Sequence, residues 1–206
     1  MLTPGARGWV GVAAALAAAA GLLATAEPAA FDWQPGLAAA EPWRWLSAAA
    51  VHYSALHLAA NLAGAALVAA LGVVARVAPA SSWAWAAALP LTHLGLLARP
   101  DLLHYGGLSG VLHAGVAVAA IELILARGPT RRWIGFALLA GLVVKVLSET
   151  PWGPALRHPA GWDIATAPFA HASGLVAGLA CAGLARWLRR PAARPATQGA
   201  STTLGH

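Results

Sequence analysis

Charged side chains and cysteines are scarce in this sequence. Only 10% of its 206 residues are charged, whereas 59% are hydrophobic. Soluble globular domains carry about 25% charged residues, so this chain has too few polar groups to cover the surface of a soluble fold. The composition therefore excludes a soluble enzyme, a nucleic-acid-binding module and a disordered chain. The single cysteine, Cys181, excludes a disulfide framework and a cysteine-based zinc site.

The net charge of +6 does not indicate a nucleic-acid partner. A phosphate-binding face needs clustered basic side chains, but here the arginines stand between apolar segments, where they act as topology signals. We therefore expect a lipid bilayer, and no nucleic acid, as a partner of the chain.

Six apolar segments are long enough, or nearly so, for the roughly 20 residues that a bilayer crossing needs. The first is interpreted as an uncleaved signal anchor rather than as a signal peptide. The segments cover residues 8–26, 54–74, 83–98, 109–126, 133–148 and 166–188. This pattern predicts an all-α membrane protein with a bundle of six transmembrane helices.

The distribution of arginine predicts the orientation of this bundle. If the N-terminus is inside, nine arginines fall on the inner side and three on the outer side. Cytoplasmic loops are enriched in basic residues, so both termini are expected in the cytoplasm. The inner arginines are Arg7, Arg76, Arg127, Arg131, Arg132, Arg186, Arg189, Arg190 and Arg194, and the outer ones are Arg44, Arg99 and Arg157.

The chain divides into a first transmembrane helix (1–26), the rest of the helical core (27–190) and a tail (191–206). Within the core, residues 27–53 are too polar to cross a membrane but rich in tryptophan, and we expect them to lie in the outer interface. The tail is rich in Pro, Ala, Thr and Gly and is expected to be a disordered cytoplasmic segment. Six tryptophans near the ends of the segments predict interfacial belts: Trp9, Trp83, Trp85, Trp133, Trp152 and Trp187.

Polar side chains inside the apolar segments are few, and such residues are costly in lipid and usually functional. Three have structural interpretations: Glu122 reaches the inner interface near Arg127, Lys145 extends to the outer edge, and His93 forms a helix-to-helix hydrogen bond. The others lie on segments that run inward, at similar depths below the outer surface. These are His57, Asn61, Ser109, His113 and His171.

This second set of residues suits nucleophilic catalysis. Ser109 lies between Gly107 and Gly110 in a Gly-Leu-Ser-Gly motif at a loop-to-helix junction, where backbone N–H groups can hold an oxyanion. A serine needs a base such as a neutral histidine. His171 supplies one, and no carboxylate accompanies it in its segment, so we predict a Ser–His dyad without metal or cofactor.

Further features support this dyad. His57 and Asn61 are four residues apart on one helix face, where both can donate hydrogen bonds to an oxyanion. His171, Gly174 and Gly178 share one face of the last segment, and small residues allow close helix crossings in lipid. Gly110 and Ala114 form a similar strip after Ser109. Packing of the two strips is expected to bring Ser109 to His171.

Four motifs follow one another along residues 43–186: Trp43-Arg44, His52-x4-His57-x3-Asn61, Gly107-Leu108-Ser109-Gly110, and Ala170-His171-Ala172-Ser173-Gly174 followed by Gly178. In this order they resemble the motifs of the rhomboid family of intramembrane serine proteases. The resemblance implies a six-helix core in which Ser109 is the nucleophile and His171 the base. It also implies that His57, Asn61 and the Ser109 N–H stabilise the oxyanion, on membrane-anchored protein substrates.

The chain departs from many rhomboids at His113, where they have an aromatic residue that stacks on the catalytic histidine. The run from Gly107 to His113 is similar to the rhombosortase subgroup. That similarity implies a bacterial inner-membrane enzyme open to the periplasm, and substrates that end in a Gly-Gly motif, a helix and a basic tail. Three roles stay open for His113: an orienting group for His171, a second base, or passive packing.

Other interpretations remain. A general rhomboid protease with other substrates fits the same motifs. A haem or metal protein could use His57, His93, His113 and His171 as ligands, but it does not need Ser109. An inactive rhomboid-like binding protein is disfavoured, because the predicted nucleophile and base are both present. The sequence does not indicate the oligomeric state.

Overall fold

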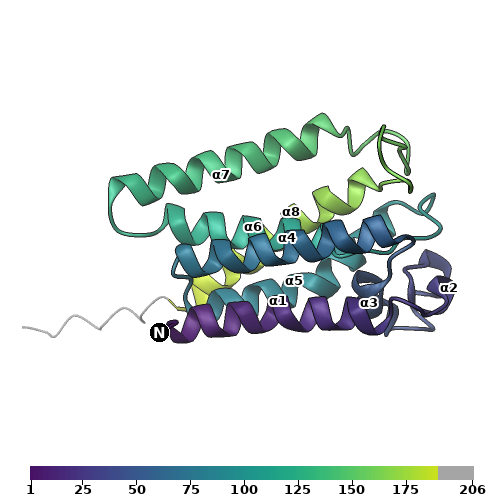
Figure 1. Ribbon diagram of the computed structural model, residues 1–206. Coiled ribbons are helices and arrows are strands. Elements are labelled where there is room, and N and C mark those ends of the chain that lie inside the picture. The colour runs from purple at the N-terminus through teal and green to yellow at the C-terminus, as the bar shows by residue number, and fades with distance from the viewer. Residues whose placement is uncertain (190–206) are drawn as a thin grey trace, which may run out of the picture.

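The computed structural model describes residues 1–189 and, over them, an all-helical protein without a β-strand. Six helices of 16 to 21 residues run side by side (Figure 1). The elements are α1 (Pro4–Leu22), α2 (Pro28–Phe31), η1 (Pro35–Leu37), α3 (Arg44–Ser47), η2 (Ala48–Ala50), α4 (Ala55–Val74), α5 (Pro79–Gly95), η3 (Leu96–Ala98), α6 (Ser109–Ile124), α7 (Pro129–Ser148) and α8 (Pro168–Leu188). The predicted all-α class is confirmed for these residues, and the predicted tail, 191–206, lies outside them.

The six long helices coincide with the six predicted segments, except at several ends. Helices α1, α5 and α7 begin at Pro4, Pro79 and Pro129 instead of residues 8, 83 and 133. Proline suits the first position of a helix, because its fixed φ matches the helix and its missing N–H would have no partner there. The predicted segments began with the apolar run and so omitted this first turn.

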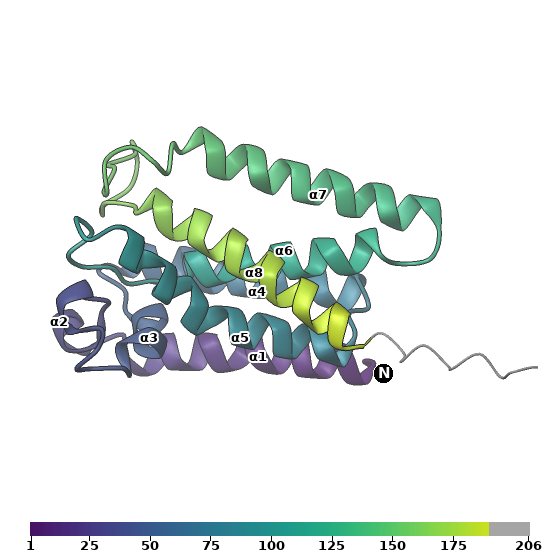
Figure 2. The same cartoon turned by 180° about the vertical axis from the view of Figure 1, so that it is seen from behind.

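Three of the helices, α1, α4 and α8, are long and apolar enough to cross a membrane. Helix α6 is a shorter apolar helix. Helices α5 and α7 lie alongside these four in the same bundle (Figures 1 and 2).

Helix α6 is the centre of the bundle and contacts α4, α5, α7 and α8. Ten of its 16 residues are buried, as expected for a helix that is apolar on all sides. Helix α7 packs mainly on α6 at the edge of the bundle, and only Gly135, Leu142 and Val146 are buried on it (Figure 2).

Two of the six tryptophans predicted for interfacial belts belong to the core. Trp9 and Trp85 are fully buried, and their ring centroids are 4.4 Å apart. Their indole N–H groups donate to the carbonyls of Val68 and Val111, at 2.8 and 2.9 Å. The belt prediction is wrong for this pair, because both side chains lie on helix faces that pack against neighbouring helices inside the bundle. The other four tryptophans are exposed: Trp83, Trp133, Trp152 and Trp187.

The segment between α1 and α4 folds into a cap of short helices at one end of the bundle (Figure 1). Its centre is Arg44, which is 4% exposed and donates to Glu41 Oε2 (2.6 Å) and to the Asp32 carbonyl oxygen (2.7 Å). Trp33 pairs through its backbone with Tyr105, in the loop before α6. The cap therefore supports the loop that leads to Ser109.

Candidate active site

Ser109 is the first residue of α6, and the loop before it has an unusual conformation. Gly107 has φ of +128°, and a Cβ atom there would lie 2.7 Å from His57 Nε2, so only glycine fits. The Gly107 N–H donates to the Ala48 carbonyl (2.9 Å), and the Tyr105 hydroxyl donates to the Gly107 carbonyl (3.1 Å). These contacts hold the serine at a helix N-terminus, where N–H groups lack intrahelical partners.

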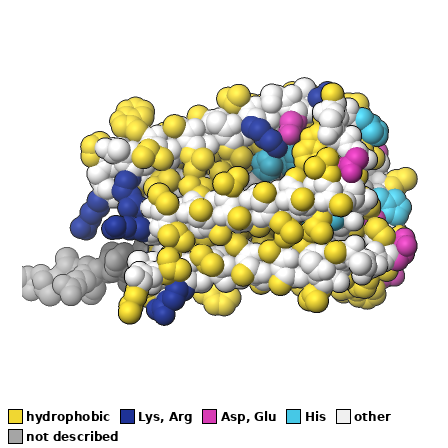
Figure 3. Space-filling view, in the orientation of Figure 1, with side chains coloured by type: hydrophobic (Ala, Val, Ile, Leu, Met, Phe, Trp, Pro, Cys, Tyr) yellow, Lys and Arg dark blue, Asp and Glu magenta, His cyan; other side chains and the backbone are white. Residues whose placement is uncertain are grey.

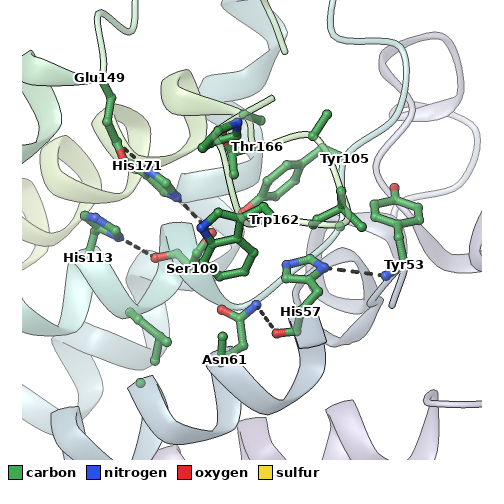
Figure 4. Close-up of a pocket in the computed structure, with 18 of the residues that line it drawn as sticks. Tyr53, His57, Asn61, Tyr105, Ser109, His113, Glu149, Trp162, Thr166 and His171 are labelled. Carbon is green, nitrogen blue, oxygen red and sulfur yellow. Dashed lines mark hydrogen bonds and ion pairs between the residues drawn. The ribbon is translucent and has the colours of Figure 1, made fainter. Parts of the chain in front are cut away.

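His171 lies in the first turn of α8 and is buried. Its Nε2 is 3.0 Å from Ser109 Oγ, within hydrogen-bond distance (Figure 4). The structure thus brings together the two residues predicted as base and nucleophile.

The close crossing of α6 and α8 makes this contact possible. A Cβ atom on Gly174 would overlap the Gly110 carbonyl oxygen, and one on Gly178 would lie 2.5 Å from the Ala114 carbonyl oxygen. The two helix backbones therefore touch along the glycine face that the sequence predicts, directly below the Ser–His contact.

His113, one turn after Ser109, stacks on His171 with ring centroids 4.2 Å apart and planes 10° apart. Its Nδ1 is 2.6 Å from the Ser109 carbonyl oxygen, which can only accept, so Nδ1 carries the proton. Its Nε2 then accepts from Lys145 Nζ at 2.7 Å. Because this nitrogen contacts Lys145 and not Ser109, the geometry favours an orienting role for His113 over that of a second base.

Two charged residues that were not predicted for the site reach it from the end of α7. Glu149 Oε2 is 2.7 Å from His171 Nδ1, and Glu149 Oε1 is 2.9 Å from Lys145 Nζ (Figure 4). Lys145, predicted to extend to the outer edge, instead contacts His113 and Glu149. Their spacing of four places both on one face of α7, but the sequence does not say which helix that face meets.

Glu149 is ionised at neutral pH. Burial opposes its ionisation, but the hydrogen bonds and charges of His171 and Lys145 outweigh burial and lower the pKa of Glu149 to about 2. A carboxylate, which accepts hydrogen bonds and does not donate them, therefore faces His171 Nδ1.

His57 and Asn61 line the same cavity from α4. One N–H of the Asn61 amide donates to the His57 carbonyl oxygen (3.1 Å), and the amide carries a second N–H. The Tyr53 N–H donates to His57 Nδ1 (3.5 Å), which leaves the imidazole proton on Nε2, beside Gly107. Both side chains can therefore act as donors near Ser109 (Figure 4).

The cavity has a volume of about 640 Å³ and lies between α4, α6, α7 and α8. Its walls include apolar side chains such as Val68, Leu112 and Leu142. The loop between α7 and α8 contributes Trp162 (Figure 4). Asp163, in the same loop, accepts a hydrogen bond from the hydroxyl of Ser54 at the start of α4 (2.9 Å). The loop is thus tied to the far side of the cavity.

The other polar residues singled out from the sequence lie outside this site. His93 is fully buried with Nδ1 2.6 Å from the Trp45 carbonyl oxygen, which joins α5 to α3. Glu122, predicted to reach the inner interface, accepts from the Ser81 hydroxyl and lies 3.7 Å from Arg189.

The alternative interpretation as a metal or haem protein rests on the histidines of the apolar segments. No group of three His, Cys, Asp or Glu side chains within residues 1–189 is placed to hold a metal ion. The buried His93 is also enclosed by protein, so it has no room for a haem ligand.

Comparisons with known proteins assign no function to the chain. No protein-family model matches the chain, and no curated protein is detectably similar to it.

Proposed function

We propose that this protein is an intramembrane serine endopeptidase that hydrolyses a peptide bond in or near the transmembrane segment of a membrane-anchored protein. The observation that carries the proposal is the 3.0 Å contact between Ser109 Oγ and His171 Nε2, at a cavity that also receives two donor side chains.

The reaction follows from these positions. Ser109 Oγ attacks the scissile carbonyl carbon while His171 Nε2 takes the hydroxyl proton, and His171 then gives this proton to the leaving amine. A water molecule, activated by the same nitrogen, hydrolyses the acyl-enzyme. The oxyanion receives hydrogen bonds from the Ser109 N–H, Asn61 and His57; loss of one such donor usually costs about 10²–10³-fold in kcat.

In this proposal all six long helices cross the bilayer. Large apolar side chains on the flanks are exposed, including Leu67 (73%) and Val176 (65%). In Figure 3, hydrophobic side chains cover the flank, and most Lys and Arg side chains in view gather at the end where α1 begins. The acidic and histidine side chains in view lie toward the other end. The positive-inside rule then supports cytoplasmic termini and a site open to the periplasmic face.

The resemblance to rhombosortases supports a narrower substrate class: proteins with a C-terminal Gly-Gly motif, a transmembrane helix and a basic tail. The apolar cavity suits the first turn of the substrate's transmembrane helix. The two glycines before that helix give the substrate backbone the freedom to reach Ser109.

A reconstituted cleavage assay tests both the proposed protease function and the narrower substrate class. The purified protein is mixed in vesicles with a reporter that ends in Gly-Gly, a helix and a basic tail, and mass spectrometry identifies the new C-terminus. We expect cleavage beside the helix by the wild type and none by Ser109→Ala. A second reporter carries Leu-Leu in place of Gly-Gly. Equal cleavage of both reporters would indicate a general rhomboid-type protease, and no cleavage of either by folded protein would contradict the proposal.

A further inference from the structure

The charged and titratable side chains around His171 form a closed chain of donors and acceptors. Lys145 Nζ contacts His113 Nε2 (2.7 Å) and Glu149 Oε1 (2.9 Å). His113 Nδ1 contacts the Ser109 carbonyl oxygen (2.6 Å), Ser109 Oγ contacts His171 Nε2 (3.0 Å), and His171 Nδ1 returns to Glu149 Oε2 (2.7 Å). Only one arrangement of the protons gives every one of these contacts a donor and an acceptor.

Glu149 determines that arrangement at His171. A neutral imidazole carries one N–H, and a carboxylate can only accept, so the proton lies on Nδ1 and Nε2 is left to accept from Ser109. Lys145 Nζ is also near, 3.2 Å from Nδ1, and an ammonium can only donate. If Lys145 instead of Glu149 held Nδ1, the imidazole proton would move to Nε2. His171 could then not accept the serine proton.

We propose that Glu149 is a positioning residue for the base: its carboxylate keeps the His171 proton on Nδ1, and Lys145 holds that carboxylate in place. The inference rests on the proposed protease function and adds a third member to the predicted Ser109–His171 pair. During attack the serine proton moves to Nε2, and the Nδ1 proton stays on nitrogen. The Glu149 carboxylate, 2.7 Å away, then stabilises the imidazolium.

The substitution Glu149→Gln gives this proposal a specific signature. The Lys145 ammonium can only donate, so it stays hydrogen-bonded to the oxygen of the substituted side-chain amide. The NH₂ group of that amide then faces His171 Nδ1. Nδ1 must then accept, and the proton moves to Nε2. Adding Lys145→Met removes this constraint, and the amide can rotate to present its oxygen to His171. A second substitution in the same cluster should therefore restore activity, which a purely structural role for Glu149 does not predict.

The experiment compares the rate of Ser109 labelling by a fluorophosphonate, and kcat and KM for the Gly-Gly reporter, in purified full-length variants. For Glu149→Gln we expect labelling and kcat to fall about 10²–10⁴-fold with KM and melting temperature near wild type. In Glu149→Gln with Lys145→Met, labelling should rise at least about tenfold above the single variant, toward that of Lys145→Met alone. Glu27→Gln, the same change at an exposed glutamate away from the cavity, is the matched control and should have no effect.

The outcomes separate this inference from the proposed function. If wild-type Ser109 is not labelled, the protease function itself fails, and the inference with it. If wild type is labelled and Glu149→Gln is labelled at about the same rate, or if Lys145→Met lowers it further, Glu149 does not position His171. If Glu149→Gln does not fold, Glu149→Asp and Glu149→Asn provide the same comparison at a shorter length. Aspartate should retain at least about tenfold more activity than asparagine, and equal activity would overturn the inference.

Discussion

Gly174 of α8 lies against the carbonyl group of Gly110 in α6, so the helices that carry His171 and Ser109 touch backbone to backbone. The contact is one turn from the 3.0 Å approach of His171 Nε2 to Ser109 Oγ. The distance between base and nucleophile therefore depends on the absence of a side chain at this crossing.

Gly174→Val should inactivate the site through geometry. Overpacking of such a contact costs about 1–3 kcal/mol or separates the helices, and a misplacement of about 1 Å can cost 10²-fold in rate. Fluorophosphonate labelling of Ser109 should fall accordingly, although Ser109 is unchanged. Gly183→Val is the matched control, because a Cβ atom at Gly183 of the same helix meets nothing within 4 Å. Equal labelling of both variants and wild type would show that the crossing does not set the distance.

Gly107→Ala should disturb the loop before Ser109. Its positive φ strains any side-chain-bearing residue by about 1–3 kcal/mol, and the new Cβ would press on His57 Nε2. Turnover of the reporter should fall more than stability does. Gly128→Ala carries a similar strain at φ +96° with no neighbour within 4 Å, so it isolates the contact with His57. Equal losses of turnover in the two variants would argue against that contact.

Asn61→Ala should lower kcat by about 10²–10³-fold without abolishing cleavage, because the Ser109 N–H and His57 remain as donors. Reporter kinetics measure this effect, and a melting temperature near wild type separates it from a structural one. Unchanged kcat would remove Asn61 from the oxyanion site, and loss of folded protein would make it a structural link within α4.

Arg44→Ala should destabilise the cap at the cavity end of the bundle. Removal of one partner from a buried ion pair costs about 3–5 kcal/mol, because it leaves the other charge without compensation. Here that charge is Asp32, which is 1% exposed but keeps its contacts with Tyr53 (3.0 Å) and His104 (2.8 Å), so we expect a loss below this range. Thermal unfolding followed by tryptophan fluorescence measures the change, and Arg157→Ala, at an exposed position, should shift the transition little. A transition for Arg44→Ala like that of wild type would contradict this account of the cap.

Much of the helical framework was predictable, because apolar segments and proline-initiated helices have local signatures. The strip of Gly110 and Gly174 was also predictable, since small residues at helical spacing share a face. The prediction was wrong for the fully buried Trp9 and Trp85, because tertiary packing decides which face of a helix meets its neighbours.

The C-terminal end of α7 shows what local sequence patterns cannot predict. Glu149 and Lys145 looked like charges near the end of an apolar segment, and such residues usually extend toward water. Their contact with His171 depends on how α7 is rotated against α6 and α8, which is a property of tertiary packing. No periodicity within one segment encodes this rotation.

The most direct test of the central claim is to locate a fluorophosphonate adduct by mass spectrometry of the purified protein. The account predicts an adduct on Ser109 in the wild type, and none on Ser109 in His171→Ala when that variant is folded. Folded wild-type protein without an adduct, or with its adduct on a serine other than Ser109, would contradict the assignment of Ser109 and His171 as nucleophile and base.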